Sequence, residues 1–176
     1  VPKLTGANIP FAIRARVVLL RDLGAPLSPF NAFQIIQGLE TVALRMKQHC
    51  VNAEKVVAFL ETQKKVTNVI YPTNHQGEIK ERAKMYMKGG YGSLVGMDVG
   101  TREEGSKFID NLKMLYHVAN IGDARSLAIH PATTTHSQLN EEELLAADVT
   151  PGSVRLYIGI DHRDDIMTDI KNTLAA

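Results

Sequence analysis

The chain has 176 residues, of which 44% are hydrophobic and 22% are charged, and its formal net charge is +1. This length and mix are typical of one globular domain, or of one domain with a piece of another, that can bury a core. The nearly neutral charge excludes an electrostatic case for nucleic acid or an anionic membrane as partner.

The cysteine content and the apolar runs set further limits. Cys50 is the only cysteine, so neither an internal disulfide nor an all-cysteine zinc site can form, and we expect a cytoplasmic location. No apolar run is long enough to span a bilayer, and no signal peptide is evident. Because the chain begins at Val1 and not at Met, we expect that an N-terminal portion precedes it.

Two helices are predicted in the first third of the chain. The first covers residues 11–22 and ends before a glycine. Ser28 is a good N-cap for the second, and apolar residues then recur at steps of three and four. This stripe predicts one helix over residues 28–63, bent near Gly38 or His49. A helix of about 50 Å is longer than a small domain is wide, so it is expected to bridge two domains.

From residue 66 onward, strands and helices alternate. This order predicts a small sheet covered by helices, of the α/β or α+β class. We therefore expect residues 1–63 to hold the end of one domain and a connecting helix, and residues 64–176 to form a small α/β domain. The predicted strands cover 66–72, 93–100, 125–131 and 154–160, and the predicted helices cover 77–90, 102–119, 140–148 and 161–176.

Two histidines in the segment HPATTTH, His130 and His136, are candidates for a functional loop. They are six residues apart with no carboxylate cluster nearby, a spacing that disfavours a metal site. The alternative is a structural role, in which the three threonines between them form hydrogen bonds within their own turn. An intermediate interpretation is that the segment lines a substrate site.

Cysteine and glycine motifs give weaker signals. Cys50 follows His49 on the apolar stripe, and adjacent helical residues do not face each other, so a core cysteine is favoured over a nucleophile with its base. The glycine-containing segments 89–92 and 120–126 match neither a P-loop nor a dinucleotide fingerprint, and turn glycines explain both.

Arg155 stands inside an otherwise apolar predicted strand, VRLYIGI. Arginine is almost never fully buried without a partner. Its planar guanidinium suits a bidentate clamp on a carboxylate. The alternative is a structural ion pair with one of the chain's own acids, and spacing does not exclude it. The residues alone contain no complete catalytic constellation.

Three long segments carry a family resemblance. They are LRDLGAPLSPFNAFQIIQGLETVALRMKQHC, HVANIGDARSLAIHPATTTHSQL and VRLYIGIDHRDDIMTDI, and together they cover nearly the whole chain. They resemble the C-terminal portion of the cystathionine and methionine metabolism family of pyridoxal-phosphate enzymes. Within it they look most like the O-acetylhomoserine sulfhydrylases, which replace the acetoxy group of O-acetyl-L-homoserine by sulfide or a thiol.

The resemblance implies a fold and a cofactor. The fold would be the C-terminal domain of the aspartate-aminotransferase-like fold, preceded by a long interdomain helix. The cofactor would be pyridoxal 5′-phosphate, bound to a lysine in an S-x-T-K setting that no lysine of this chain matches. Because covalent pyridoxal chemistry needs that lysine, we expect no catalytic residue and no cofactor ligand here, and we expect the chain alone to be inactive.

The family also implies partners and a set of substrate-binding residues. We expect a missing N-terminal domain, a homotetramer made of paired dimers, and a small amino-acid substrate. Arg155 matches the family arginine that grips the substrate α-carboxylate. Asn120 falls where γ-lyases carry a serine that helps to hold it, and Thr135 and His136 match a loop near the substrate mouth.

Two other activities stay open. The parent enzyme could be a methionine γ-lyase or a cystathionine synthase or lyase of the same family. The chain could instead be a non-catalytic α/β module that binds an amino acid through Arg155.

Overall fold

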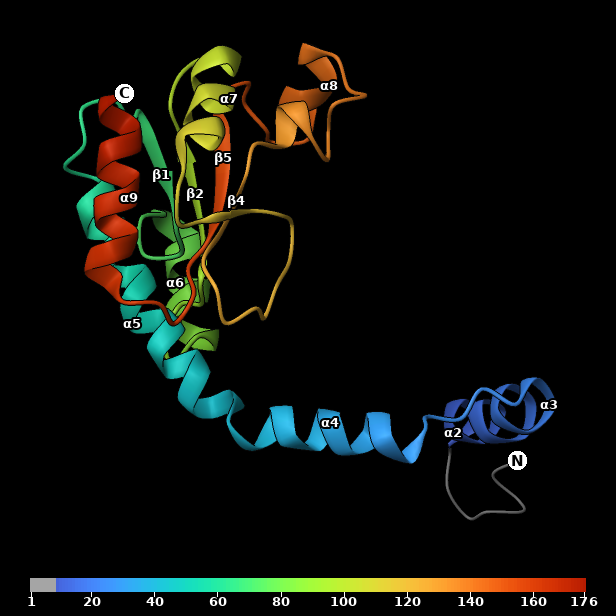
Figure 1. Cartoon of the computed structure of the whole chain (residues 1–176). Helices are drawn as coiled ribbons and strands as arrows, with labels where there is room; N and C mark the ends of the chain where they lie inside the picture. Colours follow the sequence, from blue (N-terminus) through green and yellow to red (C-terminus); the bar gives the residue numbers. More distant parts are fainter. Residues whose placement is uncertain (1–8) are drawn as a thin grey trace. The chain divides into compact units, whose positions relative to one another are not determined.

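The computed structural model describes residues 9–176, which fall into two compact units (Figure 1). The first unit ends at Val42, and the second comprises Ala43–Ala176. The described part of the first unit is helical and begins with a short helix, a π-helical turn and a further helical turn. These are α2 (Pro10–Arg14), η1 (Ala15–Leu20) and α3 (Arg21–Leu23), and α4 (Pro29–Glu40) follows.

Local capping signals are confirmed in the first unit. Gly24, at the end of α3, adopts the left-handed conformation with φ of 64°, which glycine adopts without strain. The hydroxyl of Ser28 accepts a hydrogen bond from the N–H of Asn31 at 3.1 Å, so it caps α4 as predicted.

The predicted helix over residues 28–63 is two helices, which corrects the expectation of one. α4 ends at Glu40, and α5 runs from Val42 to Leu60. Between them Thr41 leaves the helical conformation, with φ of −108° and ψ of 0°. The break lies neither at Gly38 nor at His49. A β-branched residue weakens a helix locally, and only α5 has a buried face that packing can hold in place.

The boundary between the two compact units lies at 42/43. The reason is that α5 belongs to the core of the second unit. Its side chains from His49 onward are buried at steps of three and four. The buried residues of α5 are His49, Cys50, Asn52, Ala53, Val56, Val57 and Leu60.

The second unit contains a five-stranded mixed sheet in the order β1-β2-β5-β4-β3. Only the β3–β4 pair is parallel. The α/β class is therefore confirmed. The strands are β1 (Asn68–Ile70), β2 (Leu94–Asp98), β3 (Tyr116–His117), β4 (Leu127–Ile129) and β5 (Ser153–Tyr157), and the helices after α5 are α6 (Gly77–Tyr86), α7 (Arg102–Asn111), α8 (Glu141–Ala146) and α9 (Arg163–Ala175).

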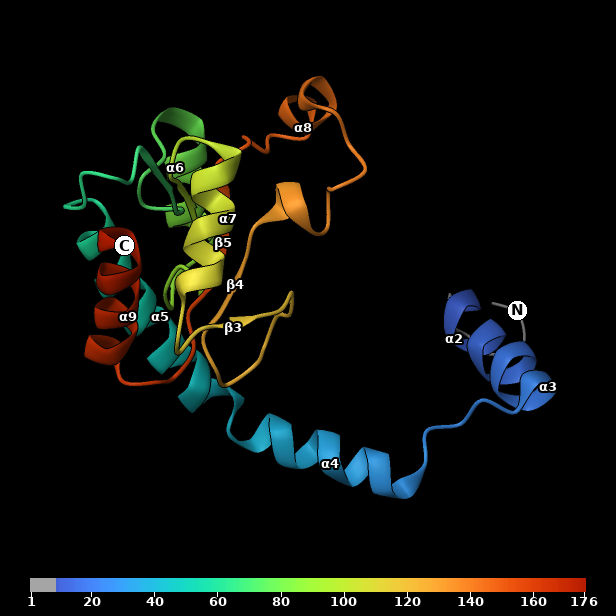
Figure 2. The ribbon, with the colours of Figure 1, turned by 45° about the horizontal axis from the view of Figure 1, so that its top comes forward.

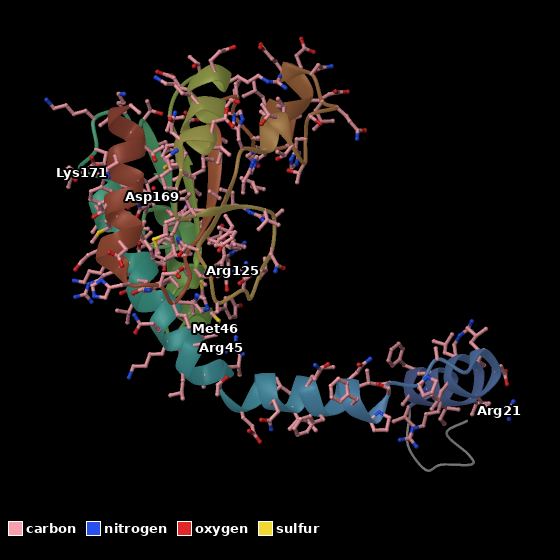
Figure 3. The ribbon with its side chains drawn as sticks, in the orientation of Figure 1. Arg21, Arg45, Met46, Arg125, Asp169 and Lys171 are labelled. Atoms are coloured by element: carbon pink, nitrogen blue, oxygen red, sulfur yellow. The ribbon has the colours of Figure 1, made fainter. Side chains whose placement is uncertain are left out.

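The helix predicted over 102–119 is too long, and strand β3 was not predicted. α7 ends at Asn111, and the next residues are held by a carboxylate from a distant helix. Asp169 of α9 accepts hydrogen bonds from the backbone N–H groups of Lys113, Met114 and Leu115 at 2.8–3.2 Å. Those N–H groups cannot then continue a helical ladder. In Figure 3, Asp169 lies on α9.

One face of the sheet packs against α5, α7 and α9 and forms the core. Figures 1 and 2 show these helices beside the strands. Val154 and Leu156 of β5 are 1% and 0% exposed within it. Because strand side chains alternate, Arg155 between them points to the second face. Its neighbours on the adjacent strands there are Gly96 and Ile129.

The end of β5 is joined to α5 by three hydrogen bonds. His49 Nδ1 lies 2.6 Å from the carbonyl oxygen of Ile158. The Asn52 amide donates to the carbonyl oxygens of Gly159 and Asp161, at 2.9 and 2.8 Å. Buried side chains of α5 therefore bind the backbone directly after β5, the middle strand of the sheet.

The segment that leads into β4 packs directly on Gly159. A Cβ atom at Gly159 would lie 2.5 Å from the carbonyl oxygen of Ala124 and 2.5 Å from the carbonyl carbon of Arg125. Gly159 N–H donates to the Ser126 hydroxyl at 2.9 Å, and Ser126 N–H donates to the Asp161 carboxylate at 2.7 Å. We call this contact between residues 124–126 and 159–161 the Gly159 junction.

Replacing Gly159 by Ala should lower the free energy of unfolding by about 1–3 kcal/mol, because the new methyl group would meet backbone atoms that cannot rotate away. Urea unfolding followed by circular dichroism measures the change. Gly89→Ala is the control, because a Cβ there meets nothing within 4 Å. Equal stabilities of the two variants would contradict the close approach.

Candidate functional site

A cavity of about 210 Å³ opens on the second face of the sheet, around Arg155. It also contains Thr135 and His136, so three of the four predicted substrate-binding residues come together. The fourth, Asn120, does not line it. The lining residues are Ile70, Gly96, Met97, Ile129, Pro131, Thr135, His136, Val149, Ser153, Val154 and Arg155.

Arg155 is partly buried, and within residues 9–176 its guanidinium has neither a hydrogen bond nor an ion pair. The structural ion pair considered as an alternative therefore has no partner in this part of the chain. Gly96, directly across from Arg155 on β2, has no side chain, and Ile70 packs beside it, where an added Cβ would lie 3.1 Å from the Ile70 Cβ. The arginine is thus free to bind a carboxylate that enters the cavity.

The threonine segment follows the 3₁₀ turn η2 (Pro131–Thr133). The Thr134 hydroxyl donates to the carbonyl oxygen of His130 at 2.8 Å, so this threonine bonds its own turn. Thr135 differs, because its hydroxyl lies 2.9 Å from Nδ1 of His136. This contact leaves Nε2 of His136 without a partner among the described residues. His136 therefore offers the cavity a second polar group beside Arg155.

His130 has a structural role. Its ring is fully buried, with Nδ1 2.9 Å from the Thr133 hydroxyl and Nε2 2.7 Å from the carbonyl oxygen of Pro151. With both nitrogens engaged, the imidazole has none left for a metal. Across residues 9–176, no three His, Cys, Asp or Glu side chains meet in an arrangement that could hold a metal ion.

His49 and Cys50 do not form a nucleophile and base pair. His49 Nδ1 is used at the end of β5, while its Nε2 is buried without a partner among residues 9–176. Cys50 packs against Gly90, where an added Cβ would lie 2.6 Å from its sulfur. Both residues belong to the packing of α5.

Asn120 lies in the segment that joins β3 to β4. Figure 2 shows this segment as a loop. Its side-chain oxygen accepts a hydrogen bond from the Ile121 N–H at 2.9 Å. The side chain is exposed and lies near Asp123, whose pKa is held far below its usual range, chiefly by the Arg125 side chain and also by the Asn120 amide. Asn120 is thus held within its own loop and not at Arg155.

Sequence reasoning missed the residues that shape the cavity around Arg155. Ile70, Gly96 and Ile129 stand in one row with Arg155 across four strands. The signal that could have found them is the strand alternation. Strand alternation shows which residues of one strand share a face, but not which strands are neighbours. The pairing of β2 with β5, which are far apart in sequence, is known only from the structure.

One protein family matches this chain over almost its full length. The family described as Cys/Met metabolism PLP-dependent enzyme matches residues 6–175. No helix of the described residues is long and apolar enough to cross a membrane.

Several curated proteins are similar to this chain. The O-acetyl-L-homoserine sulfhydrylase of Leptospira meyeri is 49% identical over 96% of this chain and 39% of its own length. The homocysteine/cysteine synthase of Saccharomyces cerevisiae is 37% identical over 94% of this chain and 40% of its own length. The chain thus spans about 40% of the length of the curated relatives it matches.

A solved structure is also similar. It is an O-acetylhomoserine (thiol)-lyase from Campylobacter jejuni that carries N′-pyridoxyl-lysine-5′-monophosphate. The TM-score is 0.87 at 40% sequence identity, over 98% of this chain and 42% of the other.

The cavity around Arg155 does not fit pyridoxal phosphate by itself. The cofactor needs an amine for its covalent bond and a partner for its pyridinium nitrogen. No lysine, aspartate or glutamate stands among the residues that line the cavity. The donors present are one guanidinium, one imidazole and hydroxyl groups, which suit a carboxylate.

The stability of the protein should depend on the charge state of His130. Burial lowers the pKa of His130 below its ordinary value, with a smaller contribution from the charge of Arg102 and an opposing one from the hydrogen bond to Pro151. The folded protein therefore binds this proton less readily than the unfolded chain does. The stabilisation is complete above the unfolded pKa of about 6.5 and is lost as pH falls below it.

Urea unfolding at about pH 7.5 and about pH 5 measures this effect. We expect the free energy of unfolding to fall more in the wild type than in His130→Gln, which has no imidazole at this site. His162→Gln, at an exposed histidine, should behave like the wild type. An equal fall in all three proteins would show that His130 is not the group involved.

Proposed function

Because the chain belongs to the Cys/Met metabolism PLP-dependent enzyme family, we propose that it is the carboxylate-binding part of an O-acetylhomoserine sulfhydrylase. The reaction would replace the acetoxy group of O-acetyl-L-homoserine by sulfide or a thiol. Relatives named as O-acetyl-L-homoserine sulfhydrylases from Leptospira meyeri and Thermus thermophilus support this assignment, at 49% and 41% identity.

The single observation that carries the proposal is the unpartnered guanidinium of Arg155 in its cavity. A guanidinium can donate two parallel hydrogen bonds to a carboxylate, and this fixes the orientation of the ligand as well as its position. In an amino-acid substrate this orientation decides which bond at Cα faces the cofactor. The role of Arg155 is therefore binding and orientation.

The other predicted residues have lesser roles in this proposal. His136, held by Thr135, would contact the substrate at the mouth of the cavity. Asn120 would approach the same carboxylate from the β3–β4 loop. When bound, pyridoxal phosphate would supply the electron sink for the reaction. Its lysine would come from a domain outside this sequence, and the chain alone would be an inactive part of a transferase.

We propose that the chain acts together with an N-terminal pyridoxal-phosphate domain in a cytoplasmic homotetramer. The exposed apolar side chains of α4 support a covering partner, since isolated domains rarely leave so many uncovered. Phe30, Phe33, Ile36 and Leu39 of this helix are 54–66% exposed.

Replacing Arg155 by Ala in the complete enzyme should raise KM for O-acetyl-L-homoserine and lower kcat/KM. Loss of one charged, bidentate contact costs about 2–5 kcal/mol, or roughly thirty- to several-thousand-fold in kcat/KM. Steady-state kinetics with sulfide held at saturation measure the change. Arg155→Lys should restore only part of the loss, because a point charge cannot reproduce the planar fork.

The matched control is Arg163→Ala, an exposed arginine on α9 whose nearest acid is 3.8 Å away. It should leave KM unchanged. The free energy of unfolding is measured on all three variants. An Arg155→Ala protein that unfolds more easily but keeps a normal KM would overturn the carboxylate-clamp role and favour a structural one.

The 176-residue chain should not hold pyridoxal phosphate covalently. No lysine lines the cavity of Arg155, and none lies in the family's lysine setting. After incubation with the cofactor, borohydride reduction and proteolysis, mass spectrometry should find no single lysine modified above the others. One lysine labelled stoichiometrically would contradict the proposed division of labour between the two domains.

A further inference from the structure

We infer that Asp123 and Arg125, braced on Tyr116, are positioning residues that hold the loop carrying Asn120 in place for the substrate carboxylate. This inference rests on the proposed function in one respect only, that Asn120 is a substrate contact. The geometry of the brace is independent of it. The loop comprises residues 118–123, between β3 and the Gly159 junction.

The loop has one rigid end. At the Gly159 junction, the Ile160 N–H donates to the carbonyl oxygen of Ala124 at 2.8 Å. Ser126 is bound to Gly159 and to Asp161. Residues 124–126 are therefore bound to the residues that follow β5, the strand that carries Arg155.

The brace extends this rigid end back along the loop. The Arg125 backbone N–H donates to the Asp123 carboxylate at 3.0 Å. Its guanidinium donates to both oxygens of the same carboxylate, at 3.1 and 3.0 Å. The guanidinium carbon also lies 4.5 Å from the ring centre of Tyr116, in cation–π geometry. Arg125 thus connects the loop both to its own backbone and to strand β3. Figure 3 labels the Arg125 side chain.

Asn120 lies three residues before Asp123 in the same loop. The Asp123 carboxylate has its pKa lowered far below the usual range, first by the Arg125 side chain and also by the Asn120 amide. The Asn120 oxygen in turn binds the Ile121 N–H. The contacts therefore run from Tyr116 through Arg125 to Asp123, in the loop that also carries Asn120.

The brace lies outside the core of the second unit. The Arg125 side chain is 52% exposed, and exposed ion pairs contribute little to global stability. Its effect is therefore local order in the loop. Ordering a binding residue before the ligand arrives reduces the entropy lost on binding, which improves affinity.

Amide hydrogen exchange of the 176-residue chain, followed by NMR, tests the brace without any substrate. Arg125→Ala and Asp123→Asn should both speed the exchange of the Ile121 N–H at least threefold, because its acceptor is no longer held. Core amides of Val95 and Leu156 should be unchanged, as should every amide outside α9 in the control Arg163→Ala. Unchanged exchange of Ile121 in both variants would overturn the brace.

Kinetics of the complete enzyme test the consequence for the substrate. Arg125→Ala should raise KM for O-acetyl-L-homoserine by about threefold to tenfold, with kcat within about twofold, because an exposed pair of this kind contributes modestly. Arg125→Lys should recover part of the KM. An unchanged KM, or a fall in kcat alone, would overturn the positioning role.

The two levels of failure can be told apart. If Arg155→Ala also leaves KM unchanged, the proposed function has failed, and the exchange of Ile121 still decides whether the brace exists. If Arg155→Ala raises KM while Arg125→Ala does not, only the positioning role is lost.

Discussion

The backbone approach at Gly159 is the constraint on which the candidate site depends. Only a residue without a side chain lets the backbone of residues 124–126 pass so close to the end of β5. Hydrogen bonds from His49 and Asn52 of α5 hold this strand end from the other side. The junction therefore links one core helix, the end of β5 and the segment that follows the loop of Asn120.

The pleat of β5 then decides what Arg155 can do. Since Val154 and Leu156 are committed to the core, Arg155 must point to the other face of the sheet. Its neighbours there are Gly96, which has no side chain, and Ile129, which cannot pair with a charge. A guanidinium held among apolar neighbours without an acid is poised for an anionic ligand, and the amino-acid substrates proposed here carry one.

The histidines show how similar residues are used differently within one short segment. His130 is buried, with both nitrogens bonded, and its lowered pKa follows from that burial. It also fills the space beside Gly105, where a Cβ would lie 2.5 Å from its Nε2. His136 lies six residues later at the cavity, beside Thr135. The segment thus combines a structural anchor with a wall of the cavity.

The sequence by itself determined the features that depend on neighbours along the chain. These include the cap at Ser28, the α/β class and the single arginine inside an apolar strand. The tertiary structure alone decided the end of α7 at Asn111 and the cavity around Arg155. Each of these depends on contacts between distant residues, such as Asp169 with residues 113–115. Local periodicity cannot report a hydrogen bond whose donor and acceptor lie more than fifty residues apart.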